Sequence, residues 1–92
     1  MAQPRAPKSA PPKRWATKLT RRIVVRKGPH DWLLSLDDAR LYILKHLQDA
    51  SDPAPVEKAV DLLVHAAGTG RLADREAATA QMERALRGRG WL

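Results

Sequence analysis

The chain has 92 residues, a formal net charge of +7 and no cysteine. This length allows one domain, and the lack of cysteine excludes disulfides and thiolate metal sites within the chain. No apolar run approaches the roughly 18 residues that cross a bilayer, so we expect no membrane association.

The positive charge is concentrated at the N-terminal end. Residues 1–27 hold nine Lys or Arg residues and no acid, whereas residues 28–92 hold eight basic and ten acidic residues, which leaves +9 in the first part and −2 in the second. Four prolines among the first twelve residues replace the apolar centre of a secretory signal and argue against an amphipathic transit helix. We therefore expect a cytoplasmic protein whose anionic partners meet its N-terminal end.

The N-terminal end is also poor in residues that can be buried. Ordering residues 1–13 would cost about 1–2 kcal/mol per residue in backbone entropy, with no apolar burial to offset the loss. We predict a disordered basic tail over residues 1–18 and a small folded domain over residues 19–92.

Two short apolar runs follow the tail. Residues 23–25 are Ile-Val-Val, which suit a pleated and partly buried surface, and residues 32–34 are Trp-Leu-Leu. The turn residues Gly28 and Pro29 separate them, so the pattern predicts a β-hairpin with Val24 and Leu34 in the core. A two-stranded sheet has open edges, which leaves a homodimer through a strand open.

Three amphipathic helices are predicted after the hairpin. The first begins at the cap residue Ser35 and runs over residues 36–50, the second follows Asp52 and ends at a Gly68 cap, and the third runs from residue 73 or 74 to Gly88. The last two residues are expected to fold back on the core. The predicted core residues are Val24, Leu34, Leu36, Ile43, Leu47, Val60, Leu63, Met82 and Leu86.

The resulting fold class is α+β, with a two-stranded hairpin packed on two or three helices in the order strand, strand, helix, helix, helix. Within this order stand residues 22–25 (Arg-Ile-Val-Val), 38–39 (Asp-Ala), 66–68 (Ala-Ala-Gly), 77–78 (Ala-Ala) and 85–86 (Ala-Leu). With these residues the chain resembles the small proteins catalogued as domain of unknown function 982, which are common in soil and plant-associated bacteria. The resemblance covers residues 21–92, implies a small α+β fold and carries no activity over to particular residues.

Residues that could bind a metal or take part in catalysis are scattered along the sequence. His30, His46 and His65 lack metal-ligand spacing, and partly buried, hydrogen-bonded histidines explain the latter two better than a metal does. No nucleophilic side chain stands beside a general base in a known catalytic motif, and Ser35 is instead expected to cap a helix. We therefore expect no catalytic residue, no metal site, no cofactor and no enzymatic activity.

The tail contains the residues that indicate a function. Its cations can neutralise phosphates of DNA or RNA, and Trp15 among them either stacks on an unpaired base or packs on the domain. The first hypothesis is an accessory protein that binds nucleic acid nonspecifically through the tail. The alternative is a protein-interaction or regulatory module that uses its helix surface, with the tail incidental. The candidate nucleic-acid-binding residues are Lys8, Lys13, Arg14, Trp15, Lys18, Arg21 and Arg22.

Overall fold

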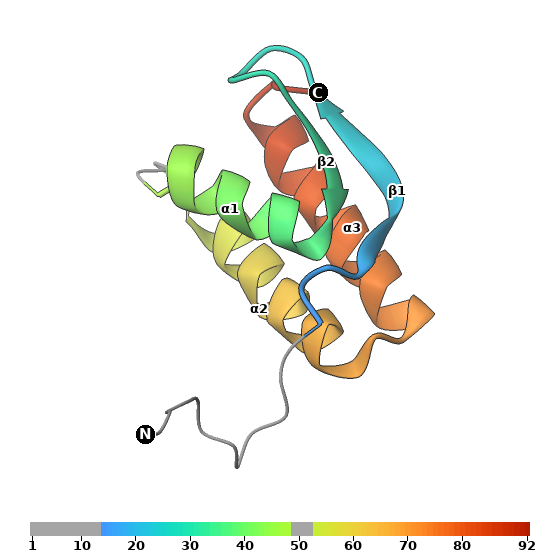
Figure 1. Ribbon diagram of the computed structural model, residues 1–92. Coiled ribbons are helices and arrows are strands. Elements are labelled where there is room, and N and C mark those ends of the chain that lie inside the picture. The colour runs from blue at the N-terminus through green and yellow to red at the C-terminus, as the bar shows by residue number, and fades with distance from the viewer. Residues whose placement is uncertain (1–13, 49–52) are drawn as a thin grey trace, which may run out of the picture.

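The computed structural model describes residues 14–48 and 53–92 of the chain. A β-hairpin is followed by three helices, in the order β1 (Lys18–Val25), β2 (Asp31–Ser35), α1 (Leu36–His46), α2 (Ala54–Thr69) and α3 (Leu72–Gly88) (Figure 1). This confirms the predicted α+β class and the order of its elements. Residues 1–13, which belong to the tail predicted to be disordered, lie outside the described residues.

The hairpin buries a different set of residues from the predicted one. Its strands are antiparallel, with Ile23 opposite Leu33 and Val24 opposite Trp32. Ile23 and Leu33 are buried, whereas Val24 is only partly buried and Leu34 is 47% exposed. The prediction of Val24 and Leu34 as core residues is therefore wrong. Successive strand residues face opposite sides, and a continuous apolar run does not reveal which side faces the core.

A capping box joins the hairpin to α1. The Ser35 hydroxyl accepts a hydrogen bond from the Asp38 N–H at 3.1 Å, and the Asp38 carboxylate accepts one from the Ser35 N–H at 3.1 Å. This confirms Ser35 as the cap of this helix. The helix ends at His46, short of the predicted residue 50, and the Leu47 N–H closes its last turn by donating to the Ile43 carbonyl. The predicted cap Asp52 lies outside the described residues.

The end of α2 also differs from the prediction. Gly68 lies inside the helix, and Gly70, with a φ of 67°, is the cap whose N–H donates to the Ala66 carbonyl. The left-handed conformation at Gly70 favours glycine, so of the two glycines the backbone path selects the second. The next helix, α3, begins at Leu72, one residue before the earliest start predicted for it.

The core lies between the hairpin and the helices. β1 packs on α3, β2 packs on α1, and α2 packs on both α1 and α3. Between α2 and α3, small buried residues such as Ala66, Ala67 and Ala78 allow the two backbones to approach closely. The predicted core residues that are buried are Leu36, Ile43, Leu47, Leu63, Met82 and Leu86.

The C-terminal residues return to the hairpin, as predicted. The Trp91 carbonyl accepts hydrogen bonds from the N–H groups of Arg26 and Lys27 at 2.9 and 3.1 Å. The Trp91 ring meets Tyr42 edge-on at 6.3 Å between centroids. Figure 1 shows the C-terminus beside the end of β1. These contacts close the hairpin end of the domain.

Candidate nucleic-acid interface

The seven predicted site residues fall into three groups. Lys8 and Lys13 lie outside the described residues. Arg14 and Trp15 form the entry to the fold, where the Arg14 N–H donates to the Ala67 carbonyl of α2 at 2.7 Å. The remaining three lie on β1. Residues 14–17, assigned to the tail from the sequence, therefore run against the helices.

Trp15 packs on the folded part of the chain. Its partly buried ring lies against the hydrophobic core, and its carbonyl accepts from the Asp37 N–H at 2.9 Å. The Arg40 guanidinium lies 4.9 Å from the ring centroid, in a cation–π arrangement. Of the two arrangements left open for Trp15, packing on the domain is the one observed. A nucleic-acid base could reach this face of the ring only if Arg40 moved.

Arg21 is held by two carboxylates of α3. Its guanidinium donates to both oxygens of Glu76, at 2.9 and 3.0 Å, and to both oxygens of Glu83, at 2.5 and 3.0 Å. Glu76 also accepts from the Thr20 hydroxyl at 2.6 Å. These hydrogen bonds, first that of Thr20 and then those of Arg21, lower the pKa of Glu76, and the carboxylates raise the pKa of Arg21. Arg21 thus ties β1 to α3 and has its charge balanced locally.

Lys18, Arg21 and Arg22 are all exposed on β1, but of the three only Arg21 forms a salt bridge within the described residues. The Arg22 guanidinium lies 5.0 Å from the ring centroid of Trp32 on β2. Trp32 is 58% exposed and lies opposite Val24 in the register. Sequence reasoning placed Trp32 in the hairpin but missed its exposure. The signal was the strict alternation along the strand, which puts Trp32 and Leu34 on the side opposite the buried Leu33.

We call this side of the hairpin the outer face. A shallow hollow at the turn end of the hairpin is bordered by Val24, Val25, Arg26, His30 and Trp32. The side chains of this face therefore combine exposed apolar surface with cations. The outer face consists of Arg22, Val24, Arg26, Trp32 and Leu34.

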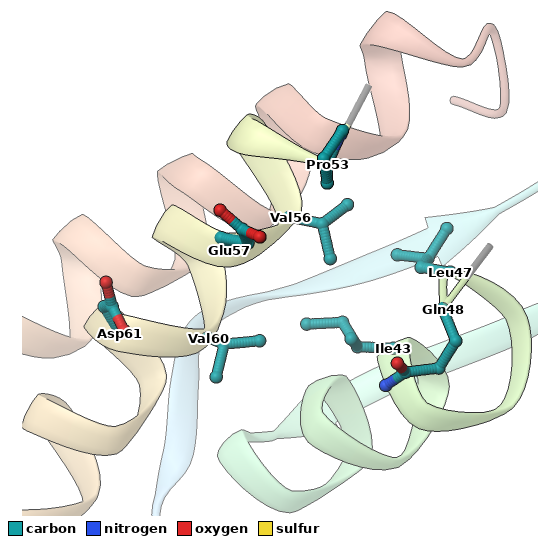
Figure 2. Close-up of a pocket in the computed structure, with 8 residues that line it drawn as sticks. All are labelled: Ile43, Leu47, Gln48, Pro53, Val56, Glu57, Val60 and Asp61. Atoms are coloured by element: carbon teal, nitrogen blue, oxygen red, sulfur yellow. The ribbon is translucent and has the colours of Figure 1, made fainter. Parts of the chain in front are cut away.

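A second surface feature is a groove between α1 and α2, with a mixed apolar and polar lining and a volume of about 400 Å³. Figure 2 shows Ile43 and Leu47 from the α1 side turned toward Val56 and Val60 of α2. Val60 is 37% exposed at the edge of this groove, so its prediction as a core residue is wrong. The charged residues bordering the groove are acidic. The groove is lined by Ile43, Leu47, Gln48, Pro53, Val56, Glu57, Val60 and Asp61.

The three histidines lie apart from one another. His30 bonds the Arg26 carbonyl, and His65 lies 3.6 Å from the Asp74 carboxylate. The His46 ring lies against Tyr42 at a tilt of 55°, with 4.7 Å between centroids. Within residues 14–48 and 53–92, no three His, Cys, Asp or Glu residues gather where they could hold a metal ion. In the same part of the chain, no helix is long and apolar enough to cross a membrane.

The fold and these surfaces define a small α+β domain with an exposed basic and aromatic hairpin. A comparison with models of known protein families gives no match, and neither do comparisons with curated proteins or with solved structures. The resemblance to the domain of unknown function 982 therefore stays a prediction.

Proposed function

We propose that this protein binds nucleic acid nonspecifically through its basic N-terminal segment, residues 1–27, and that it acts in the cytoplasm as a small bacterial accessory protein. The observation that carries the proposal is the separation of charge, with nine cations and no acid in this segment and a net −2 in the remaining residues. Cations that neutralise phosphates release counterions and bind any sequence. The proposal involves no catalytic step and no cofactor.

The described part of the chain refines the set of proposed contacts. Arg14, Lys18 and Arg22 are exposed, as a phosphate contact requires. Arg21 is a weaker candidate because two carboxylates already balance its charge. Trp15 is retained as a neighbour of the site, with its ring engaged by Arg40.

The expected salt dependence follows from the number of phosphates neutralised. All six candidate cations would give a log–log slope of affinity against salt of roughly −5 on duplex DNA. Without Arg21, five remain, Lys8, Lys13, Arg14, Lys18 and Arg22, which give roughly −4.5. The exposed charges of the longer helices are mixed, since α2 carries Glu57 and Asp61 beside Lys58 and α3 carries Glu76 beside Arg84 and Arg87. Reading of base sequence in a major groove is therefore expected to be poor.

The test is a titration of a labelled duplex at several salt concentrations with the full chain and two double variants. Lys8→Ala/Lys13→Ala removes two cations from the proposed site, and Arg84→Ala/Arg87→Ala removes two exposed cations from α3 as a matched control. We expect the first variant to flatten the slope by about 2 and the control to leave it nearly unchanged. Equal effects of the two variants, or no binding by the full chain at low salt, would contradict the proposal.

The alternative function is a protein-interaction or regulatory module, in which the basic segment is incidental. The groove between α1 and α2 favours it, because its apolar floor and the acidic residues Glu57 and Asp61 suit a basic amphipathic segment of a partner. A homodimer would be a further form of such contact. A full chain that fails to bind nucleic acid at low salt would promote this alternative.

A further inference from the structure

We propose that the outer face of the hairpin is a stacking platform for unpaired nucleic-acid strands, with Trp32 as the residue that stacks on a base. This inference rests on the proposed function and gives it a ligand class. It also assigns the stacking role to a residue outside the basic segment. Arg22 and Arg26 are the phosphate contacts on either side of the ring.

The position of Trp32 is unusual for a large aromatic residue. The side chain is 58% exposed, although burying a ring of this size would be favourable. Its neighbour on the same face, Leu34, is 47% exposed, and Val24 lies opposite Trp32 on the adjacent strand. An open sheet face with an exposed ring is the arrangement on which single-stranded nucleic acids stack.

The backbone of Trp32 is held in place while its ring remains accessible. Its backbone N–H donates to the Asp31 carboxylate at 2.8 Å, and its strand pairs with β1. The Arg22 guanidinium lies over one face of the ring, 5.0 Å from its centroid, so a base would stack on the opposite face. A base that stacks on the ring would bring its phosphates near Arg22, where both contacts act together.

The positive charge of the outer face favours a polyanion over other binding partners. Arg22 and Arg26 are exposed on it, while the Asp31 carboxylate accepts a hydrogen bond from the Trp32 backbone N–H. A second copy of the chain docked here in a symmetric dimer would bring the same cations against each other. An unpaired nucleic-acid strand supplies both the apolar base faces and the negative charges that this surface lacks.

Unpaired strands are preferred because the bases of a duplex are stacked on one another and cannot reach an indole at the surface. Stacking of one base on an aromatic side chain strengthens binding roughly 5- to 150-fold. Loss of Trp32 should therefore weaken single-strand binding by a factor in that range and leave duplex binding almost unchanged. The ratio of the single-strand affinity to the duplex affinity therefore distinguishes base stacking from attraction between charges.

The experiment compares the full chain with Trp32→Ala, Trp32→Phe and Leu72→Ala. Each protein is titrated with a labelled oligothymidine and with a duplex of equal length at one low salt concentration. We expect Trp32→Ala to lose the preference for the single strand and Trp32→Phe to keep most of it. Leu72, 65% exposed at the start of α3, is the control for loss of exposed apolar surface, and its variant should behave as the parent.

A second measurement does not depend on how the variants fold. The chain has three tryptophans, so its indole N–H groups give three resonances that can be followed during a titration with oligothymidine. We expect the Trp32 resonance to move most. An unmoved Trp32 resonance, or an unchanged affinity ratio in Trp32→Ala, would overturn the platform while duplex binding by the basic segment still stood. Absence of all binding at low salt would overturn both proposals.

Discussion

The two adjacent leucines of β2 provide a sharp test of the fold, because their roles in the structure are the reverse of those expected from the sequence. Leu33 is fully buried, whereas Leu34 is 47% exposed. Replacing Leu33 by Ala removes buried methyl groups and leaves a cavity, which costs about 2–5 kcal/mol. Replacing Leu34 by Ala removes only partly buried surface and costs about 1 kcal/mol.

These values are large compared with the stability of such a small domain. At about 0.05–0.15 kcal/mol per residue, residues 14–48 and 53–92 have a free energy of unfolding of about 4–11 kcal/mol. With a shift of about 4–8 °C per kcal/mol, Leu33→Ala should lower the melting temperature by about 8–40 °C and Leu34→Ala by about 4–8 °C.

Thermal and urea unfolding followed by circular dichroism would measure both variants against the parent. The two variants have the same change in side chain at neighbouring positions of one strand, so each controls for the other. Equal losses of stability, or a larger loss for Leu34→Ala, would refute the strand register and with it the exposure of Trp32.

Three further predictions follow from single contacts. Gly28→Ala should destabilise the fold and shift the tryptophan fluorescence, because a Cβ at Gly28 would clash with the Trp91 ring; an unchanged spectrum and melting temperature would contradict this. The pKa of Glu76 is lowered by the hydrogen bond from Thr20 and by the neighbouring guanidinium, so the stability that it contributes is present above its unfolded-state pKa and is lost as the pH falls below about 4. Urea unfolding at a series of pH values should show a weaker acid dependence in Glu76→Gln, and parallel curves would count against the contact. Burial, followed by the charge of a nearby aspartate, raises the pKa of Tyr42 to about 12, so its stabilising contribution declines as the pH rises from about 10 toward that value. Tyr42 is the chain's one tyrosine, so absorbance of tyrosinate reports it alone, and a midpoint near 10 in the folded protein would disprove its burial.

The order of the elements could be predicted because each has a local cause. Ser35 with Asp38 forms a capping box, which is visible as a short sequence pattern. The apolar spacing of α1 to α3 follows the helical period, and most of the predicted helical core residues are buried. Boundaries were less predictable, because Gly68 and Gly70 are equally suited as caps in the sequence and only the path of the backbone distinguishes them.

The candidate site was predicted only in part. The concentration of cations before Gly28 is a property of the sequence and needs no structure. Whether each of those cations can contact a phosphate depends on contacts between residues that are far apart in the sequence. Arg21 meets Glu83, 62 residues away, and Arg40 covers Trp15, so neither pairing leaves a local sequence signal.

By itself, the sequence determined the type and order of the elements and the separation of charge, because propensity, capping and net charge depend on neighbouring residues. Only the tertiary structure decided which face of the hairpin is buried. The apolar runs at residues 23–25 and 32–34 are compatible with either face, and packing on α1 and α3 buries Leu33 while it leaves Trp32 exposed. The physical reason is the two-residue period of a strand: one choice of face, made by the helices that cover it, sets the exposure of every side chain in the hairpin.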